Sequence, residues 1–186
     1  MSEPSQLYAR LHLSRHRLDE FLETTIPDPS GDAELLAWLA DAEYYGERYT
    51  PDLIRKRVDA GTTIGAWVDD LMTPAPHGVV MPARNVYDEE SQTWTLGALD
   101  FSENYDDYLT ALAVFRAAAN VKDLAGDDGF LIYGYLFEDS HVVAALQVAM
   151  GASRFLDEES AAPLVAEADV TMEALMAEGA AGAVDV

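Results

Sequence analysis

Two histidines and several pairs of neighbouring aspartates are the side chains of this chain that could bind a metal ion. His12 and His16 are four residues apart, the spacing of two zinc ligands on one helical face. A predicted strand ends and a predicted helix begins between them, so we do not expect the two imidazoles to share a face. Adjacent residues on a helix point about 100° apart, and the acid pairs lack the alternating spacing of an EF-hand loop. We therefore expect no metal site and no cofactor. The pairs are Asp69-Asp70, Asp106-Asp107 and Asp127-Asp128.

Nucleophilic and nucleotide chemistry have no sequence signature. The chain has no Cys and no Gly-x-Ser-x-Gly elbow. No glycine-rich loop of the phosphate-binding type precedes a predicted helix. These observations favour a protein without catalytic residues.

Net charge is the strongest feature of the composition. The chain carries a formal charge of −23. Residues 61–186 hold 22 acidic and only 4 basic side chains. A negative field of this size repels nucleic acid and anionic lipid, and it attracts basic proteins at raised association rates. Three alternatives remain open: a general solubility surface, adaptation to high salt, which would suit the presence of only two Lys, and a bias in codon usage.

The location of the protein is also constrained by composition. No apolar stretch approaches the roughly 20 residues of a membrane span, and the N-terminus has neither the basic nor the apolar region of a signal peptide. Because Cys is absent, no disulfide framework is possible. We expect a soluble, cytoplasmic protein that does not bind membranes.

The stretch from Ser102 to Phe137 organises the predicted fold. A helix is expected over 104–124, a turn over 126–129, and a strand over 130–137 that is buried on most of both faces. Aromatic residues such as Tyr133 and Tyr135 on that strand are expected to be core. The alternative is that they anchor a protein partner, because the surrounding charge argues against stacking on RNA bases.

The other elements are predicted around that stretch. Alternation predicts a strand over 6–14, and Ser14 is predicted to cap the helix that follows. Thr50-Pro51 starts another helix, 63–72 is a further one, and two strands joined by a polar turn follow, the first of them an edge strand because of Pro82. These two strands are predicted over 78–86 and 93–101. Further helices are predicted over 141–155 and 163–178.

These elements predict an α+β fold. The expected sheet has four mainly antiparallel strands of the split βαβ, ferredoxin-like type, with a helical insertion at about 31–76 and a C-terminal helix. We expect a single domain over 1–157, followed by an Ala- and Glu-rich segment over 158–186 that is partly helical and frayed at its end.

An acidic binding protein without catalysis fits these features best. Bacterial immunity proteins, which neutralise a cognate toxin, share this general character, although no motif of the chain defines a family. We expect a basic protein partner, a toxin or nucleic-acid-directed enzyme, and no binding of nucleic acid. Acids at element ends would form one surface that steers association, while two tyrosines supply its buried centre. The candidates are Asp88, Glu89, Glu90, Glu103, Asp106, Asp107, Asp127, Asp128, Glu138, Asp139, Tyr133 and Tyr135.

Two other functions stay open. One is a small enzyme or small-molecule-binding domain with a pocket between sheet and insertion, lined by His77, His141, Tyr133 and Tyr135. The other is a DNA mimic whose acids are spaced like phosphates. A salt-adapted housekeeping domain is the plain alternative to all of these.

Overall fold

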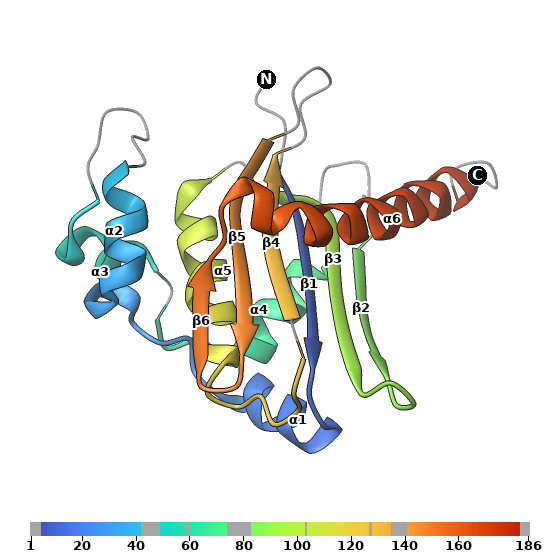
Figure 1. The fold of residues 1–186 in the computed structure, drawn as a ribbon, viewed down its shortest axis with the longest axis horizontal. Helices are drawn as coiled ribbons and strands as arrows, with labels where there is room; N and C mark the ends of the chain where they lie inside the picture. The colour runs from blue at the N-terminus through green and yellow to red at the C-terminus, as the bar shows by residue number, and fades with distance from the viewer. Residues whose placement is uncertain are drawn as a thin grey trace.

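Six strands form one antiparallel sheet in this computed structural model. The structure describes residues 5–41, 49–58, 60–73, 83–102, 104–126, 128–134 and 141–182. Across the sheet the strands run in the order β2-β3-β1-β4-β5-β6, as Figure 1 shows. The strands are β1 (Ser5–His12), β2 (Ala83–Asp88), β3 (Thr93–Ser102), β4 (Asp128–Gly134), β5 (His141–Ala149) and β6 (Ala152–Phe155).

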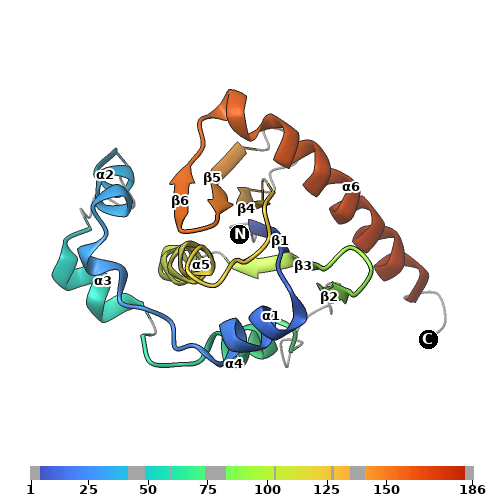
Figure 2. The ribbon, with the colours of Figure 1, turned by 60° about the horizontal axis from the view of Figure 1, so that its bottom comes forward.

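Helices cover both faces of this sheet. One face carries α1 (Arg15–Glu23), α4 (Ile64–Leu71) and α5 (Tyr105–Ala118), and the other carries α6 (Glu158–Gly182) (Figure 2). The 3₁₀ helix η1 (Pro29–Gly31) together with α2 (Ala33–Asp41) and α3 (Pro51–Arg57) lies beyond α5, on the side of β6. The described helices of the predicted insertion, α2, α3 and α4, therefore all fall between β1 and β2 in the chain.

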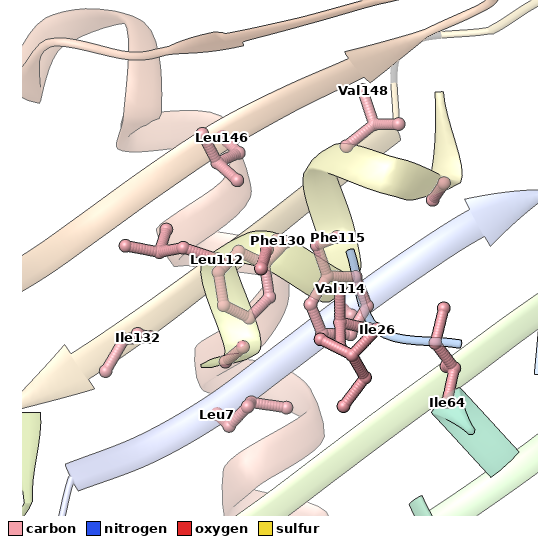
Figure 3. Packing of buried hydrophobic residues seen from close by; sticks show 14 of the residues in the cluster. Leu7, Ile26, Ile64, Leu112, Val114, Phe115, Phe130, Ile132, Leu146 and Val148 are labelled. Atoms are coloured by element: carbon pink, nitrogen blue, oxygen red, sulfur yellow. The ribbon is translucent and has the colours of Figure 1, made fainter. Parts of the chain in front are cut away.

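The larger core lies between the sheet and α5. Phe115 of α5 stacks on Phe130 of β4 with ring centroids 4.2 Å apart, and both side chains are fully buried (Figure 3). Leu7 of β1 and Leu146 of β5 face the same cluster. Burial of such side chains is the main source of stability, at roughly 1.5–3 kcal/mol for each.

A second, smaller core lies under α6. Leu164, Met172 and Leu175 of α6 pack on Tyr8, Leu131 and other residues of the sheet. The helix approaches β4 so closely that a Cβ placed on Gly129 would lie 2.5 Å from a methyl carbon of Leu164. The C-terminal segment after Asp157 therefore packs on the sheet at least as far as Leu175.

Several sequence predictions are confirmed. Strand 6–14 corresponds to β1. Ser14 occupies the N-cap position of α1, but the prediction that its side chain caps this helix is wrong, because its hydroxyl donates to Asp123 at 2.5 Å. The hydroxyl of Thr50 accepts the backbone N–H of Leu53, as predicted for this N-cap. Thr63 was predicted as the first residue of a helix; it precedes α4, and its hydroxyl accepts the backbone N–H of Ala66. The β2–β3 hairpin is present, and β2 is the edge strand. Pro82, from which the edge was predicted, lies outside the described residues.

The predicted helix over 141–155 is wrong. These residues form a β-hairpin, β5 and β6, closed at Gly151, whose φ is +74°. Apolar residues fill 142–146 without a break, and such a run suits a strand that is covered on both faces as well as it suits a buried helix. The α+β class is confirmed, but the sheet has six strands instead of four.

The last helix is longer than the predicted 163–178. α6 runs from Glu158 to Gly182 with Pro163 inside its second turn. Asp157 precedes the helix, and its carboxylate accepts the backbone N–H of Ser160 at 2.8 Å. An acceptor at this position satisfies one of the N–H groups that the first helical turn leaves without a partner.

Candidate partner-binding groove

Ion pairing within the described part of the chain involves most of its Arg and Lys side chains. In the part of the chain that the structure describes, every Arg side chain except Arg154 pairs with an acid of the same chain. The guanidinium of Arg154 instead donates to Gln147. Since acids outnumber bases 34 to 11, most of the surface charge that remains is negative.

Helix α6 concentrates that excess. Its 25 residues include six acids and no base. Glu167, on the side facing the sheet, accepts the hydroxyl of Tyr8 at 2.5 Å and is paired with Arg10. Burial and the neighbouring Glu167 raise the pKa of Tyr8, so this phenol stays protonated as a donor. The pairs made by Glu167 and, at 2.5 Å to Arg84, by Glu178 fix the helix on the sheet.

The outward side of α6 keeps four acids without a cation. Glu158, Glu159, Asp169 and Glu173 are exposed and form no ion pair with any described residue. Two large apolar side chains are exposed on the same helix, Val170 at 69% and Met176 at 41%. A row of unpaired acids interrupted by apolar side chains has the composition expected of a surface that meets a basic protein.

A groove of about 660 Å³ runs between the first half of α6 and the start of β5. Most of the residues that line the groove are aliphatic, and its acidic side chains lie on α6 or directly before it. It is lined by Trp38, His141, Val142, Val143, Ala144, Ala145, Leu156, Asp157, Glu158, Ala161, Ala162, Val165, Ala166 and Asp169.

The acids of this groove are held at its two ends. Asp157 and Glu158 lie at the N-terminus of α6, and Asp169 lies eleven residues after Glu158. Hydrogen bonds from the hydroxyl and backbone N–H of Ser160 lower the pKa of Asp157, so this carboxylate is ionised at neutral pH. Small and aliphatic residues separate the two ends. The arrangement can hold cationic groups, and His141 lines the same groove as these carboxylates.

Comparison with known proteins found no similar protein. No protein-family model, no curated protein and no solved structure matches this chain. No helix of the described chain is both long and apolar enough to cross a bilayer. Among the described side chains, no group of three or more His, Asp or Glu is placed to hold a metal ion.

The predicted single acidic surface is not present among the described candidates. Asp88, Glu89 and Glu90 are exposed in the β2–β3 turn, at the end of the sheet where His12 pairs with Thr93. Asp106 and Asp107 follow the other end of β3, which is about 30 Å away at the usual rise per residue of a strand. Asp106 pairs with Arg57 at 2.8 Å, and Asp107 accepts the hydroxyl of Ser102 at 2.5 Å.

Asp128 is not a surface acid. Its side chain is fully buried, and its two carboxylate oxygens contact His12 Nδ1 at 2.6 Å and Lys122 Nζ at 2.9 Å. The turn residues around Asp128 predicted an exposed side chain. Its basic partners are distant in the sequence: His12 belongs to β1, and Lys122 follows α5. In this fold Asp128 cannot reach a partner protein.

The other candidates are only partly described. Tyr133 is a residue of β4 paired with Val142, but its side chain is not described. Glu103, Asp127, Tyr135, Glu138 and Asp139 lie outside the described residues, and so does His77. His141, a candidate for a pocket beside the insertion, lines the groove, and Trp38 of the insertion lies on the same lining.

Glu158, Glu159, Asp169 and Glu173 of α6 were not predicted as binding residues from the sequence. A signal was available, because 158–182 contains acids at several turns of a helix and no Lys or Arg. Their relation to β5 was hidden by the prediction of a helix over 141–155.

Proposed function

We propose that this chain is an acidic, non-catalytic binding protein of the immunity or inhibitor kind. It acts in the cytoplasm on a basic toxin or nucleic-acid-directed enzyme and covers the basic cleft of that partner. The observation that carries the proposal is the outward side of α6, where Glu158, Glu159, Asp169 and Glu173 have no cation of their own among the described residues.

Acids without an internal partner suit this role for a physical reason. An acid already paired within its own chain would have to lose that partner before it could meet a new one. The α6 acids are solvated instead, and together with the net charge of −23 they would steer a basic protein toward the helix. The exposed Val170 and Met176 would supply apolar contact area once the partner has arrived.

Capture of the partner tests the proposal. The tagged full chain is incubated with lysate of its source, washed at low and then moderate salt, and the bound proteins are identified by mass. The purified partner is then assayed for loss of activity in the presence of one equivalent of this protein. We expect one stoichiometric basic partner and full inhibition.

A matched pair of variants distinguishes binding by the α6 acids from attraction by the net charge of the protein. One variant carries Glu158→Gln, Asp169→Asn and Glu173→Gln, and the other carries Glu23→Gln, Asp69→Asn and Asp70→Asn. Both remove three exposed carboxylates, so their net charges are equal. The first should lose the partner and the second should keep it. Equal capture by both variants, or no basic partner for the wild type, would argue against the proposal.

A second candidate function is the binding of a small molecule. A pocket of about 300 Å³ is lined by Asp28, Asp32, Arg116 and Asn120 above an apolar base. Asp32 is already paired with Arg116 at 2.7 Å, and Asp28 with Arg55 at 3.0 Å. These ion pairs leave Nη1 of Arg116 buried without a hydrogen-bond partner among the described residues. The pocket therefore keeps a donor group for a ligand, whereas the outward side of α6 offers a protein four acids without a cation.

We also propose that β1 to β4 with α1 and α5 form a ferredoxin-like unit, to which the β5–β6 hairpin and α6 are added. The order β2-β3-β1-β4 with antiparallel pairing throughout supports this assignment. A truncated chain that lacks α6 but retains a cooperative unfolding transition would support it further.

A further inference from the structure

We infer that the groove between β5 and α6 binds an extended basic segment, with one Arg or Lys side chain at each end of the groove. This inference rests on the proposed function and names the part of the partner that is recognised. It concerns Asp157 and Glu158 at one end, Asp169 at the other, and the aliphatic floor between them.

The floor suits the stems of basic side chains. Val142 and Ala145 of β5 and Val165 of α6 line the groove together with Leu156. Arg and Lys carry three or four methylene groups, which lie favourably on apolar surface while the charged end remains at a polar rim. A purely apolar segment would cover this floor but would leave the acids without compensation.

The ends of the groove set the spacing of the cations. Glu158 and Asp169 are eleven residues apart on α6, which is about 16 Å along the helix axis. The lining residues between them, Ala162, Val165 and Ala166, follow the spacing of one helical face. An extended chain covers about 13 Å in four residues. Two cations four residues apart therefore match the two acidic ends, given the reach of their side chains.

The negative sign of the rim excludes the other common occupants. Phosphate groups of nucleic acid or lipid would be repelled by Asp157, Glu158 and Asp169. Asp157 already caps α6 through Ser160 and interacts electrostatically with Arg154. Glu158 and Asp169 form no ion pair with a described residue, so their charges are available to a ligand. Charge complementarity thus commits the groove to a basic occupant.

Two peptides of identical composition test the spacing. The full chain, labelled on its Ala and Val methyl groups, is titrated at low ionic strength with acetyl-Arg-Ala-Leu-Ala-Arg-amide. A second titration uses acetyl-Arg-Arg-Ala-Leu-Ala-amide, which has the same charge. We expect methyl shifts at Val142, Ala145 and Val165, and affinity about fivefold higher for the spaced peptide. Equal affinities, or shifts confined to other parts of the chain, would overturn the inference.

Two variants of α6 separate the groove from the general charge of the helix. Asp169→Asn removes an acid that lines the groove, while Glu173→Gln removes an acid one turn further on that does not. We expect Asp169→Asn to weaken the spaced peptide about fivefold and Glu173→Gln to weaken it less than twofold. Equal losses would show diffuse attraction and would contradict a groove-specific site.

A blocking variant gives an independent readout. Ala166→Arg places a cation of the chain itself in the groove, and Ala177→Arg places the same charge on the same helix outside it; both alanines are exposed. The first should abolish the methyl shifts and the second should retain them. If neither peptide binds but the basic partner is still captured through the α6 acids, this inference fails and the proposed function stands.

Discussion

Oδ1 of Asp128 lies 2.6 Å from Nδ1 of His12, and the other oxygen of the same carboxylate accepts the backbone N–H of His12 at 2.8 Å. That second oxygen is also 2.9 Å from Nζ of Lys122. The side chains of Asp128 and Lys122 are 0% and 1% exposed, so both charges are removed from water. The contact fits the His12 tautomer that carries hydrogen on Nδ1, with the Asp128 oxygen as the acceptor.

Replacement of Lys122 alone should strongly lower the free energy of unfolding. In Lys122→Met the carboxylate of Asp128 stays buried and loses its cation, for which we expect about 3–5 kcal/mol of lost stability. Urea unfolding followed by circular dichroism measures the change.

The double variant Lys122→Met with Asp128→Asn controls for the loss of packing. It removes both charges and keeps the shape of the Asp128 side chain, so it should recover a large part of the lost stability. A double variant as unstable as Lys122→Met alone would contradict the assignment of the effect to an uncompensated charge.

The close approach of α6 to β4 gives a second prediction. In Gly129→Ala the new methyl would meet Leu164, whose nearest carbon lies 2.5 Å from the Cβ position. We expect destabilisation of about 1–3 kcal/mol from overpacking, measured by chemical unfolding. Leu164→Ala added to Gly129→Ala should lessen the clash and cost less than the sum of the two single changes.

Gly31→Ala is the matched control for that substitution. A Cβ at Gly31 would meet nothing within 4 Å, and its φ is not in the left-handed region. Stability should therefore change little or rise slightly. A loss at Gly31 as large as the loss at Gly129 would show that contact with Leu164 is not the cause of the destabilisation.

The lowered pKa of Asp157 predicts that the stability of the protein depends on pH. Hydrogen bonds from Ser160 hold its folded-state pKa below the ordinary value of 3.8. A carboxyl with a lowered folded pKa stabilises the protein above its unfolded pKa, and this contribution is lost as pH falls through the folded pKa. Asp157→Ala should therefore lower the melting temperature at pH 7, and the difference from wild type should shrink below about pH 3.8.

Ser160→Ala checks the cause of that pH dependence. This variant removes the hydroxyl donor and leaves the backbone N–H that bonds Asp157 at 2.8 Å. The pKa of Asp157, followed by NMR titration, should return part of the way toward its ordinary value. An unchanged pKa would mean that the hydroxyl has no part in the shift.

Arg116 gives a prediction about the contact between α2 and α5. Its guanidinium donates to both oxygens of Asp32 at 2.7 and 3.2 Å and to Glu34 at 2.8 Å, and it lies 5.4 Å from the ring centroid of Phe155. Lys cannot form the planar double contact, so Arg116→Lys should cost about 1–2 kcal/mol despite the retained charge. Thermal unfolding measures this loss, and a neutral result would show that charge alone is sufficient.

Local patterns were enough for much of the fold. The cap at Thr50 and the alternation in β1 depend on neighbouring residues, so they could be predicted from the chain. The hairpin of β5 and β6 could not, because an unbroken apolar run suits a buried helix and a buried strand equally well. Pairing with β4 decides in favour of the strand, and that partner is not visible in the local pattern.

The candidate site shows the same division. The acidic excess of residues 61–186 and the absence of bases from 158–182 were fixed by the amino-acid sequence alone, because charge is a property of composition. Which acids are available was decided only by tertiary structure. The fold buries Asp128 against Lys122, pairs Glu167 with Arg10, and leaves Asp169 in a groove beside β5. An acid becomes a binding group or a structural one according to the distant cations that the fold brings to it.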